Sequence, residues 1–131
     1  MSNQKDPKTV ALAYLEAVGQ KDFSTFESLL APDVAFTGPS ATLTGVRDVA
    51  AAYKRLGPIL LRNELKKAFV DGNEVCLIYD FVTNTPGGAV PTMEWIKIED
   101  GKVRSISLLT DHVRWPVVLQ ELARRVERKA G

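Results

Sequence analysis

Apolar residues in the first half of the chain recur at three- and four-residue spacing, which is typical of helices with one buried face. Asp6 before Pro7 is a helix-start signal, and Pro32 prevents the second helical segment from continuing. A brief alternating stretch follows Pro32. The pattern predicts helices over residues 7–18, 23–30 and 46–56, a short strand over residues 34–36 and a loop over residues 38–45.

From residue 59 onward the period changes to two, which is typical of strands. Residues 71–73 and 99–102 are turn sequences, and Pro116 opens a last helix. The pattern predicts strands over residues 59–69, 74–83, 91–98 and 103–110. Because helices come before an antiparallel sheet, we expect an α+β domain in which a curved sheet wraps over the helices.

Composition narrows the classes of protein and partner that fit the chain. Its 131 residues, 45% hydrophobic and 25% charged, suit one soluble domain over residues 1–131. A formal net charge of +1 gives no reason to expect nucleic acid or an anionic membrane as partner. Cys76 is the one cysteine, and residues 1–8 lack the apolar core of a signal peptide. We therefore expect a cytoplasmic protein.

The single histidine, His112, has no set of acidic residues at ligand spacing around it. A histidine at the end of a strand is more commonly a surface residue than a metal ligand. The sequence therefore predicts neither a metal site nor a cofactor.

Three polar residues fall on elements that otherwise present apolar residues to the core: Tyr14, Tyr53 and Glu94. Buried hydroxyl and carboxyl groups need hydrogen-bond partners, so their convergence would form the polar end of a pocket. Each also has a simpler interpretation. Either tyrosine alone can be a core residue whose hydroxyl reaches water, and Glu94 can be a solvated strand residue.

The order of elements, together with four short landmarks, resembles the nuclear transport factor 2-like (NTF2-like) superfamily, in particular its SnoaL-like and ketosteroid-isomerase-like branches. The resemblance implies a cone-shaped fold, with the N-terminal helices packed in a curved antiparallel sheet and a C-terminal helix. It also implies a pocket for a small apolar molecule with a carbonyl or hydroxyl, and a homodimer. The landmarks are Tyr14-Leu15-Glu16-Ala17, Leu30-Ala31-Pro32-Asp33-Val34, residues 45–53 and Glu99-Asp100-Gly101-Lys102-Val103.

The resemblance to ketosteroid isomerases implies that Tyr14 and a protonated Glu94 stabilise an oxyanion, with Tyr53 supporting them. The base of that family falls on Gly38, which has no side chain to move a proton. An enzyme of this kind would be an isomerase or a polyketide-cyclase-like enzyme, and its base would have to come from Asp111, Asp33 or the substrate. Asp111 has a simpler role available, which is to bond backbone amides before the last helix.

Strand parity predicts which residues face the pocket and which face outward. The apolar outer row is too large to leave comfortably in water, which favours a homodimer. We expect the binding residues to be Tyr53, Tyr79, Phe81, Ile96, Ile106, Leu108 and Phe36. We expect the outer face to carry Cys76, Ile78, Val82, Met93, Trp95 and Leu109.

Two functions fit the sequence. The first is a protein that binds a small hydrophobic molecule, with isomerase- or lyase-like chemistry as an option and Tyr14, Glu94 and Asp111 as its catalytic candidates. The second is a non-enzymatic module for dimerisation or partner docking. A cavity with room for a ligand of steroid or polyketide size favours the first, and a cavity plugged by its own aromatics favours the second.

Overall fold

The computed structural model describes residues 6–130, so residues 1–5 of the polar segment that argued against a signal peptide lie outside the described range. Its elements follow the predicted order, with β2 and a short 3-10 helix in addition. They are α1 (Pro7–Gly19), α2 (Phe23–Ser28), β1 (Leu30–Thr37), β2 (Thr42–Thr44), α3 (Val46–Arg55), the 3-10 helix η1 (Gly57–Ile59), β3 (Leu60–Asp71), β4 (Glu74–Thr83), β5 (Ala89–Glu99), β6 (Lys102–Thr110) and α4 (Arg114–Ala130). Within residues 6–130 no helix is both long and apolar enough to cross a membrane.

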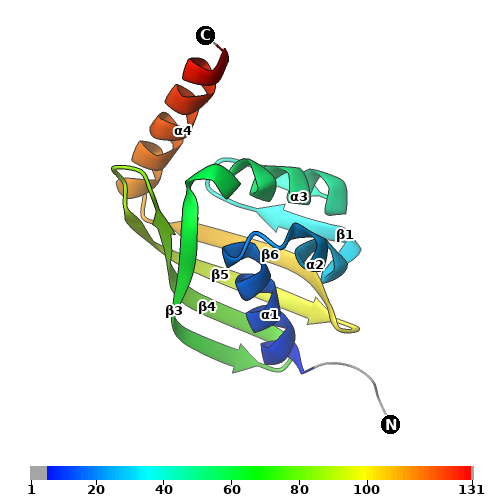
Figure 1. The fold of residues 1–131 in the computed structure, drawn as a ribbon. Coiled ribbons are helices and arrows are strands. Elements are labelled where there is room, and N and C mark those ends of the chain that lie inside the picture. The colour runs from blue at the N-terminus through cyan, green and yellow to red at the C-terminus, as the bar shows by residue number, and fades with distance from the viewer. Residues whose placement is uncertain (1–5, 131) are drawn as a thin grey trace.

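The strands form one curved six-stranded sheet in the order β2-β1-β6-β5-β4-β3. All neighbouring strands are antiparallel except β1 and β6, which run parallel. Figure 1 shows α1, α2 and α3 on the concave face of this sheet, while most of α4 projects away from it. The predicted α+β cone is therefore confirmed, with one parallel strand pair that the pattern did not indicate.

Capping side chains fix where the first two helices begin. Asp6 accepts a hydrogen bond from the Thr9 amide at 3.2 Å, and Asp22 accepts one from the Thr25 amide at 3.2 Å. Each carboxylate satisfies an amide that has no partner inside its helix. The apolar side of α1, including Val10 and Tyr14, is then buried against the sheet.

Burial alternates along the neighbouring strands β4 and β5 with a period of two. On β5 every second residue is buried, and on β4 the buried residues alternate with partly exposed ones. Because successive side chains on a strand point to opposite faces, Glu94 lies in the same inward row as Thr92 and Ile96. The strand geometry thus forces a carboxyl group into the concave side of the sheet.

The region around Pro32 differs from the prediction. Helix α2 ends at Ser28, and Pro32 lies inside β1 instead of ending a helix. The β1–β6 register shifts between Leu30 and Ala35, so the missing proline N–H falls where the ladder is interrupted. The predicted loop over residues 38–45 also contains β2, a three-residue edge strand that pairs with β1.

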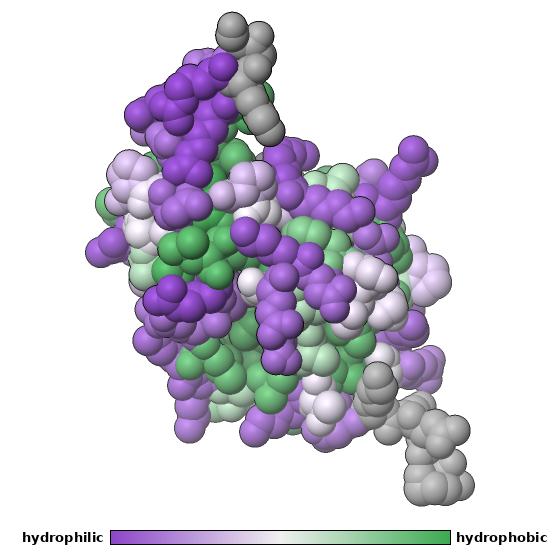
Figure 2. Space-filling model, in the orientation of Figure 1, coloured by the Kyte–Doolittle hydropathy of each residue, from purple (hydrophilic) through white to green (hydrophobic). Residues whose placement is uncertain are grey.

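Helix α4 begins at Arg114, two residues before the proline that was expected to open it. Its first turns are tied to the body because Val118 is fully buried and Arg125 bonds the Asn84 side chain at 2.7 Å. In Figure 2 hydrophilic residues cover the outer part of α4, and hydrophobic residues gather where the helix meets the body. The first half of the helix therefore closes the open end of the cone.

Leu77→Ala tests the core, because Leu77 is fully buried and registered opposite Glu94. Removing a buried leucine side chain leaves a cavity, so we expect a loss of about 2–5 kcal/mol in the free energy of unfolding. Urea denaturation measures it. Leu61→Ala makes the same change at a side chain that is 51% exposed, and we expect a much smaller loss. Equal losses in the two variants would contradict the placement of the core.

Candidate functional site

Four side chains form a continuous hydrogen-bonded chain inside the cone. The hydroxyls of Tyr14 and Tyr53 lie 2.5 Å apart, and the Tyr14 hydroxyl donates to Glu94 Oε1 at 2.6 Å. The Tyr79 hydroxyl donates to Glu94 Oε2. The order is therefore Tyr53–Tyr14–Glu94–Tyr79, with the carboxyl group bonded on both oxygens.

This hydrogen-bonded chain joins residues from four elements. Tyr14 comes from the buried face of α1 and Tyr53 from that of α3. Tyr79 is registered opposite Thr92, which makes it the diagonal neighbour of Glu94 on the adjacent strand. The structure thus brings together the three oxygen-bearing residues expected to converge, and adds Tyr79 through its hydroxyl.

Burial controls the acidity of this chain. Loss of hydration raises the pKa of the Glu94 carboxyl above its usual range, while the hydrogen bonds from Tyr14 and Tyr79 oppose that rise. Burial, reinforced by the nearby Glu94 charge, raises the pKa of Tyr14, Tyr53 and Tyr79 well above the ordinary phenol value. The phenols therefore stay protonated at neutral pH, and Glu94 is the group whose charge can change.

Aromatic packing holds two of the phenols in place. The Phe26 ring lies 5.7 Å from the Tyr14 ring and 4.7 Å from the Tyr53 ring, measured between centroids. Phe36 packs edge-on against Tyr53 at 5.7 Å. These contacts limit the rotamers available to both tyrosines and so hold their hydroxyls in position.

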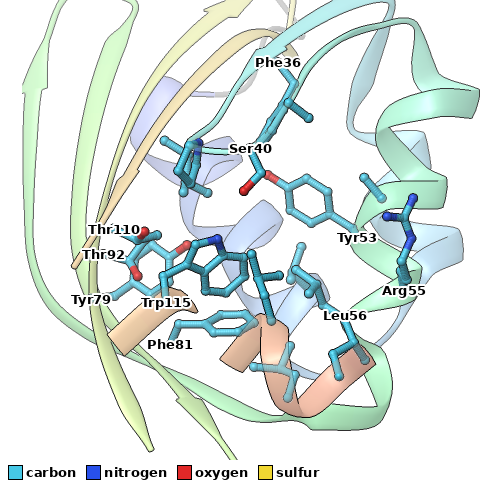
Figure 3. Close-up of a pocket in the computed structure, with 18 residues that line it drawn as sticks. Phe36, Ser40, Tyr53, Arg55, Leu56, Tyr79, Phe81, Thr92, Thr110 and Trp115 are labelled. Atoms are coloured by element: carbon cyan, nitrogen blue, oxygen red, sulfur yellow. The ribbon is translucent and has the colours of Figure 1, made fainter. Parts of the chain in front are cut away.

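A cavity of about 160 Å³ adjoins this hydrogen-bonded chain of side chains. Tyr53 and Tyr79, the two ends of the chain, belong to its lining, and Tyr14 and Glu94 do not. In Figure 3 the Trp115 indole lies inside the ring of lining side chains, with Tyr79, Thr92 and Thr110 on one side and Tyr53 on the other. The remaining lining residues are Val18, Phe36, Pro39, Ser40, Ala41, Ala52, Arg55, Leu56, Leu60, Phe81, Leu108, Leu119 and Leu122.

Five of the seven expected binding residues line the cavity, and two do not. Ile96 and Ile106 have the inward parity that was expected, but they are packed in the core and do not line the cavity. Helix α1 packs against β5 and β6, so inward parity alone does not give contact with the cavity. The other five, Phe36, Tyr53, Tyr79, Phe81 and Leu108, line it.

The residues considered as bases lie outside the cavity. Asp111 accepts hydrogen bonds from the Val113 and Arg114 amides at 2.8 and 2.9 Å, which hold its pKa below the usual range. It caps α4, as its simpler interpretation required. Asp33 is exposed and pairs with Arg104 at 3.3 Å. A side chain at Gly38 would meet the Phe36 ring, since an added Cβ would lie 2.7 Å from it.

Sequence reasoning missed several lining residues, although strand parity could have identified some of them. Thr92 and Thr110 lie two residues from Glu94 and Leu108, so the parity that turned those residues inward applies to them as well. Trp115 comes one residue before Pro116 and was not assigned to the pocket. Its role depends on where α4 docks, and local periodicity does not encode that.

The described part of the chain, residues 6–130, holds no group of three or more histidine, cysteine, aspartate or glutamate side chains able to bind a metal ion. The polar chemistry of the cavity therefore consists of hydroxyls, one indole N–H and the exposed Arg55 at its wall.

A model of the SnoaL-like domain matches residues 11–106, which is most of the chain and includes Tyr14, Tyr53, Tyr79 and Glu94. The chain belongs to the SnoaL-like domain family. The match ends before α4, so the helix that closes the cavity of this SnoaL-like protein lies outside the matched range. None of the curated proteins compared with the chain matches it.

Solved structures share the fold of this SnoaL-like protein. An NTF2-like protein of unknown function from Cytophaga hutchinsonii is 23% identical with a TM-score of 0.71, over 85% of this chain and 95% of that one. A candidate SnoaL-like polyketide cyclase from Shewanella denitrificans is 20% identical with a TM-score of 0.75, over 88% and 97%. A candidate ketosteroid isomerase from Kribbella flavida is 16% identical with a TM-score of 0.71, over 81% and 78%. At these identities the likeness shows the fold alone.

Glu94→Gln tests whether Glu94 is buried, through the pH dependence of stability. Burial raises the pKa of Glu94 in the folded state above its pKa in the unfolded state. The contribution of Glu94 to the free energy of unfolding is therefore complete below the unfolded pKa, and it is lost as pH rises through the folded pKa. We therefore expect the wild-type free energy of unfolding, minus that of the variant, to fall as pH rises from about 4.5. Urea titrations across pH 4–9 measure it.

Asp22 and Asp111, whose pKa values are lowered, act in the opposite sense, but they are present in both proteins and cancel from the difference. A difference that stays constant with pH would mean that Glu94 is solvated.

Proposed function

We propose that this protein binds a compact, mostly apolar small molecule in the cavity, with the polar group of the ligand placed against Tyr53 and Tyr79. The observation that carries the proposal is that both ends of the buried hydrogen-bonded chain belong to cavity-lining residues. A packed apolar wall with a few positioned polar groups is the usual composition of a small-molecule site. The family match supports the same reading.

The size of the cavity limits the ligand. A volume of about 160 Å³ is far below what a steroid or polyketide needs, so this cavity does not have the room expected for such ligands. An engineered cavity of about 150 Å³ in another protein holds benzene. We therefore infer a ligand with a single ring, or an acyclic molecule of similar bulk, carrying one carbonyl or hydroxyl.

Binding is better supported than base-catalysed isomerisation. Among the described residues, the cavity lining contains neither a carboxylate nor a histidine, and both Asp33 and Asp111 are engaged elsewhere. Enolisation without a positioned base loses roughly two to four orders of magnitude in rate. An isomerisation in this cavity would need a base from the substrate, with the phenols of Tyr53 and Tyr79 as acids and Tyr14 and Glu94 acting through them.

A thermal-shift screen tests the binding proposal. We expect monocyclic ketones and phenols to raise Tm because they fit the cavity, and steroids to leave it unchanged. Ala52→Phe, which adds a ring at a lining residue of α3, should abolish the shift. Ala51→Phe makes the same change at the neighbouring exposed residue and should preserve it. Shifts that survive Ala52→Phe would place binding outside the cavity.

We infer in addition that the protein is a homodimer, formed through the convex face of the sheet. Met93 is registered beside Ile78 and Leu109, which makes one apolar row across three strands, and Trp95 is registered beside Cys76, which makes an adjacent apolar pair. Met93, Trp95 and Leu109 are 41%, 48% and 68% exposed. A second copy of the chain would remove this area from water. A cytoplasmic location remains our proposal, consistent with the single cysteine.

Light scattering after size exclusion tests the dimer. Leu109→Glu places a charge in the proposed interface and should give the mass of one 14.4 kDa chain, whereas the wild type should give twice that mass. Val126→Glu makes a comparable change at an exposed residue of α4 and should remain dimeric. A monomeric wild type at micromolar concentration would overturn the dimer.

A further inference from the structure

Counting protons along the buried chain shows what it can offer to the cavity. An ionised Glu94 only accepts hydrogen bonds, so Tyr14 donates to Oε1 and Tyr79 donates to Oε2. The Tyr14 proton is then committed, and Tyr53 must donate to the Tyr14 oxygen. Three phenol protons fill three hydrogen bonds. With Glu94 ionised, Tyr53 and Tyr79 can therefore only accept hydrogen bonds from a molecule in the cavity.

A neutral Glu94 adds a fourth proton to the same three hydrogen bonds. When Glu94 donates to Tyr14, Tyr14 donates to Tyr53, and the proton of Tyr53 is free for a ligand. When Glu94 instead donates to Tyr79, the proton of Tyr79 is free. In either arrangement the hydroxyl of one cavity-lining tyrosine becomes free to donate, and no heavy atom has to move.

A separate observation indicates the kind of ligand atom that fits. The indole nitrogen of Trp115, a lining residue, is buried and has no hydrogen-bond partner among the residues that the structure describes. An indole N–H can only donate, and leaving a buried donor without a partner is unfavourable. A ligand that accepts hydrogen bonds would remove that cost. The Trp115 N–H and the hydrogen-bonded chain with a neutral Glu94 therefore both favour a ligand that accepts hydrogen bonds.

We propose that the cavity selects a hydrogen-bond acceptor, namely the carbonyl of a monocyclic ketone, aldehyde or ester, and that binding requires a proton on Glu94. The proposal rests on the proposed binding function and names its ligand class. The donor at the cavity is a phenol of Tyr53 or Tyr79, and Glu94 is a positioning residue that acts through them. Binding is consequently linked to proton uptake wherever free Glu94 is ionised.

The groups around Glu94 support its role as the titrating member. It faces Tyr14 from α1, Tyr53 from α3 and Tyr79 from β4, all of which stay protonated at neutral pH because burial raises their pKa values. Its registered neighbours on β4 and β6, Leu77 and Leu108, carry no charge. Arg55, at the cavity wall, is exposed to solvent.

The two tryptophans make a direct test possible with NMR of the indole ¹H–¹⁵N signals. Cyclohexanone, which accepts hydrogen bonds but cannot donate them, is titrated against the wild-type protein from pH 5 to pH 9. We expect the Trp115 signal to move downfield. The Trp95 signal is the internal control, because that indole bonds Glu74 at 2.7 Å on the convex face. Above the pKa of Glu94, the apparent Kd should rise about tenfold per pH unit.

Glu94→Gln supplies the matched variant, since its amide donates like a neutral carboxyl at every pH. We expect this variant to bind cyclohexanone with a Kd that does not change with pH. Methylenecyclohexane, which has the same shape and no carbonyl, should bind the wild type without pH dependence and without the downfield shift.

Each other outcome overturns a defined part of the account. A wild-type Kd for cyclohexanone that does not vary with pH would overturn the linkage to Glu94, whether or not the variant folds. Binding of methylenecyclohexane alone would overturn the acceptor proposal and leave the cavity as an apolar binding site. If neither compound binds, the proposed binding function fails as well.

Discussion

A single buried carboxyl group organises the interior of this protein. Glu94 is 1% exposed, and a carboxyl removed from water is tolerated only when its oxygens are hydrogen-bonded or its charge is neutralised. Tyr14 and Tyr79 bond its two oxygens, and Tyr53 extends the chain to the cavity. These phenols come from α1, α3 and β4. The need of the Glu94 carboxyl for hydrogen bonds therefore helps to fix how α1 and α3 lie against the sheet.

Much of the fold could be read from the sequence because local signals agreed with the tertiary structure. The turn at residues 71–73 and the mostly apolar run over residues 74–83 predicted the β3–β4 hairpin as it is observed. Pro32 misled the prediction because proline ends helices but is tolerated where a strand ladder is interrupted. That interruption depends on the parallel pairing of β1 with β6, whose registered residues are far apart in the sequence.

The polar chain was accessible to sequence reasoning, but the cavity was only partly so. Tyr14, Tyr53 and Glu94 stood out because polar groups on apolar faces need partners. Tyr79 was expected to face inward, yet its bond to Glu94 depends on the β4–β5 register. Ile96 was assigned to the cavity because parity gives the direction of a side chain and not what lies in front of it. Trp115 was missed because docking of α4 is a tertiary event.

The titration of Glu94 itself is the most direct test of this account. Carbon-13 NMR of the glutamate side-chain carboxyls, with the Glu94 signal assigned by its absence in Glu94→Gln, follows the charge of that group in the protein without a ligand. The account predicts one glutamate carboxyl that titrates at higher pH than the exposed glutamates do. A Glu94 signal that titrates together with the exposed glutamates would contradict burial of the carboxyl group, and with it the organising role of the chain.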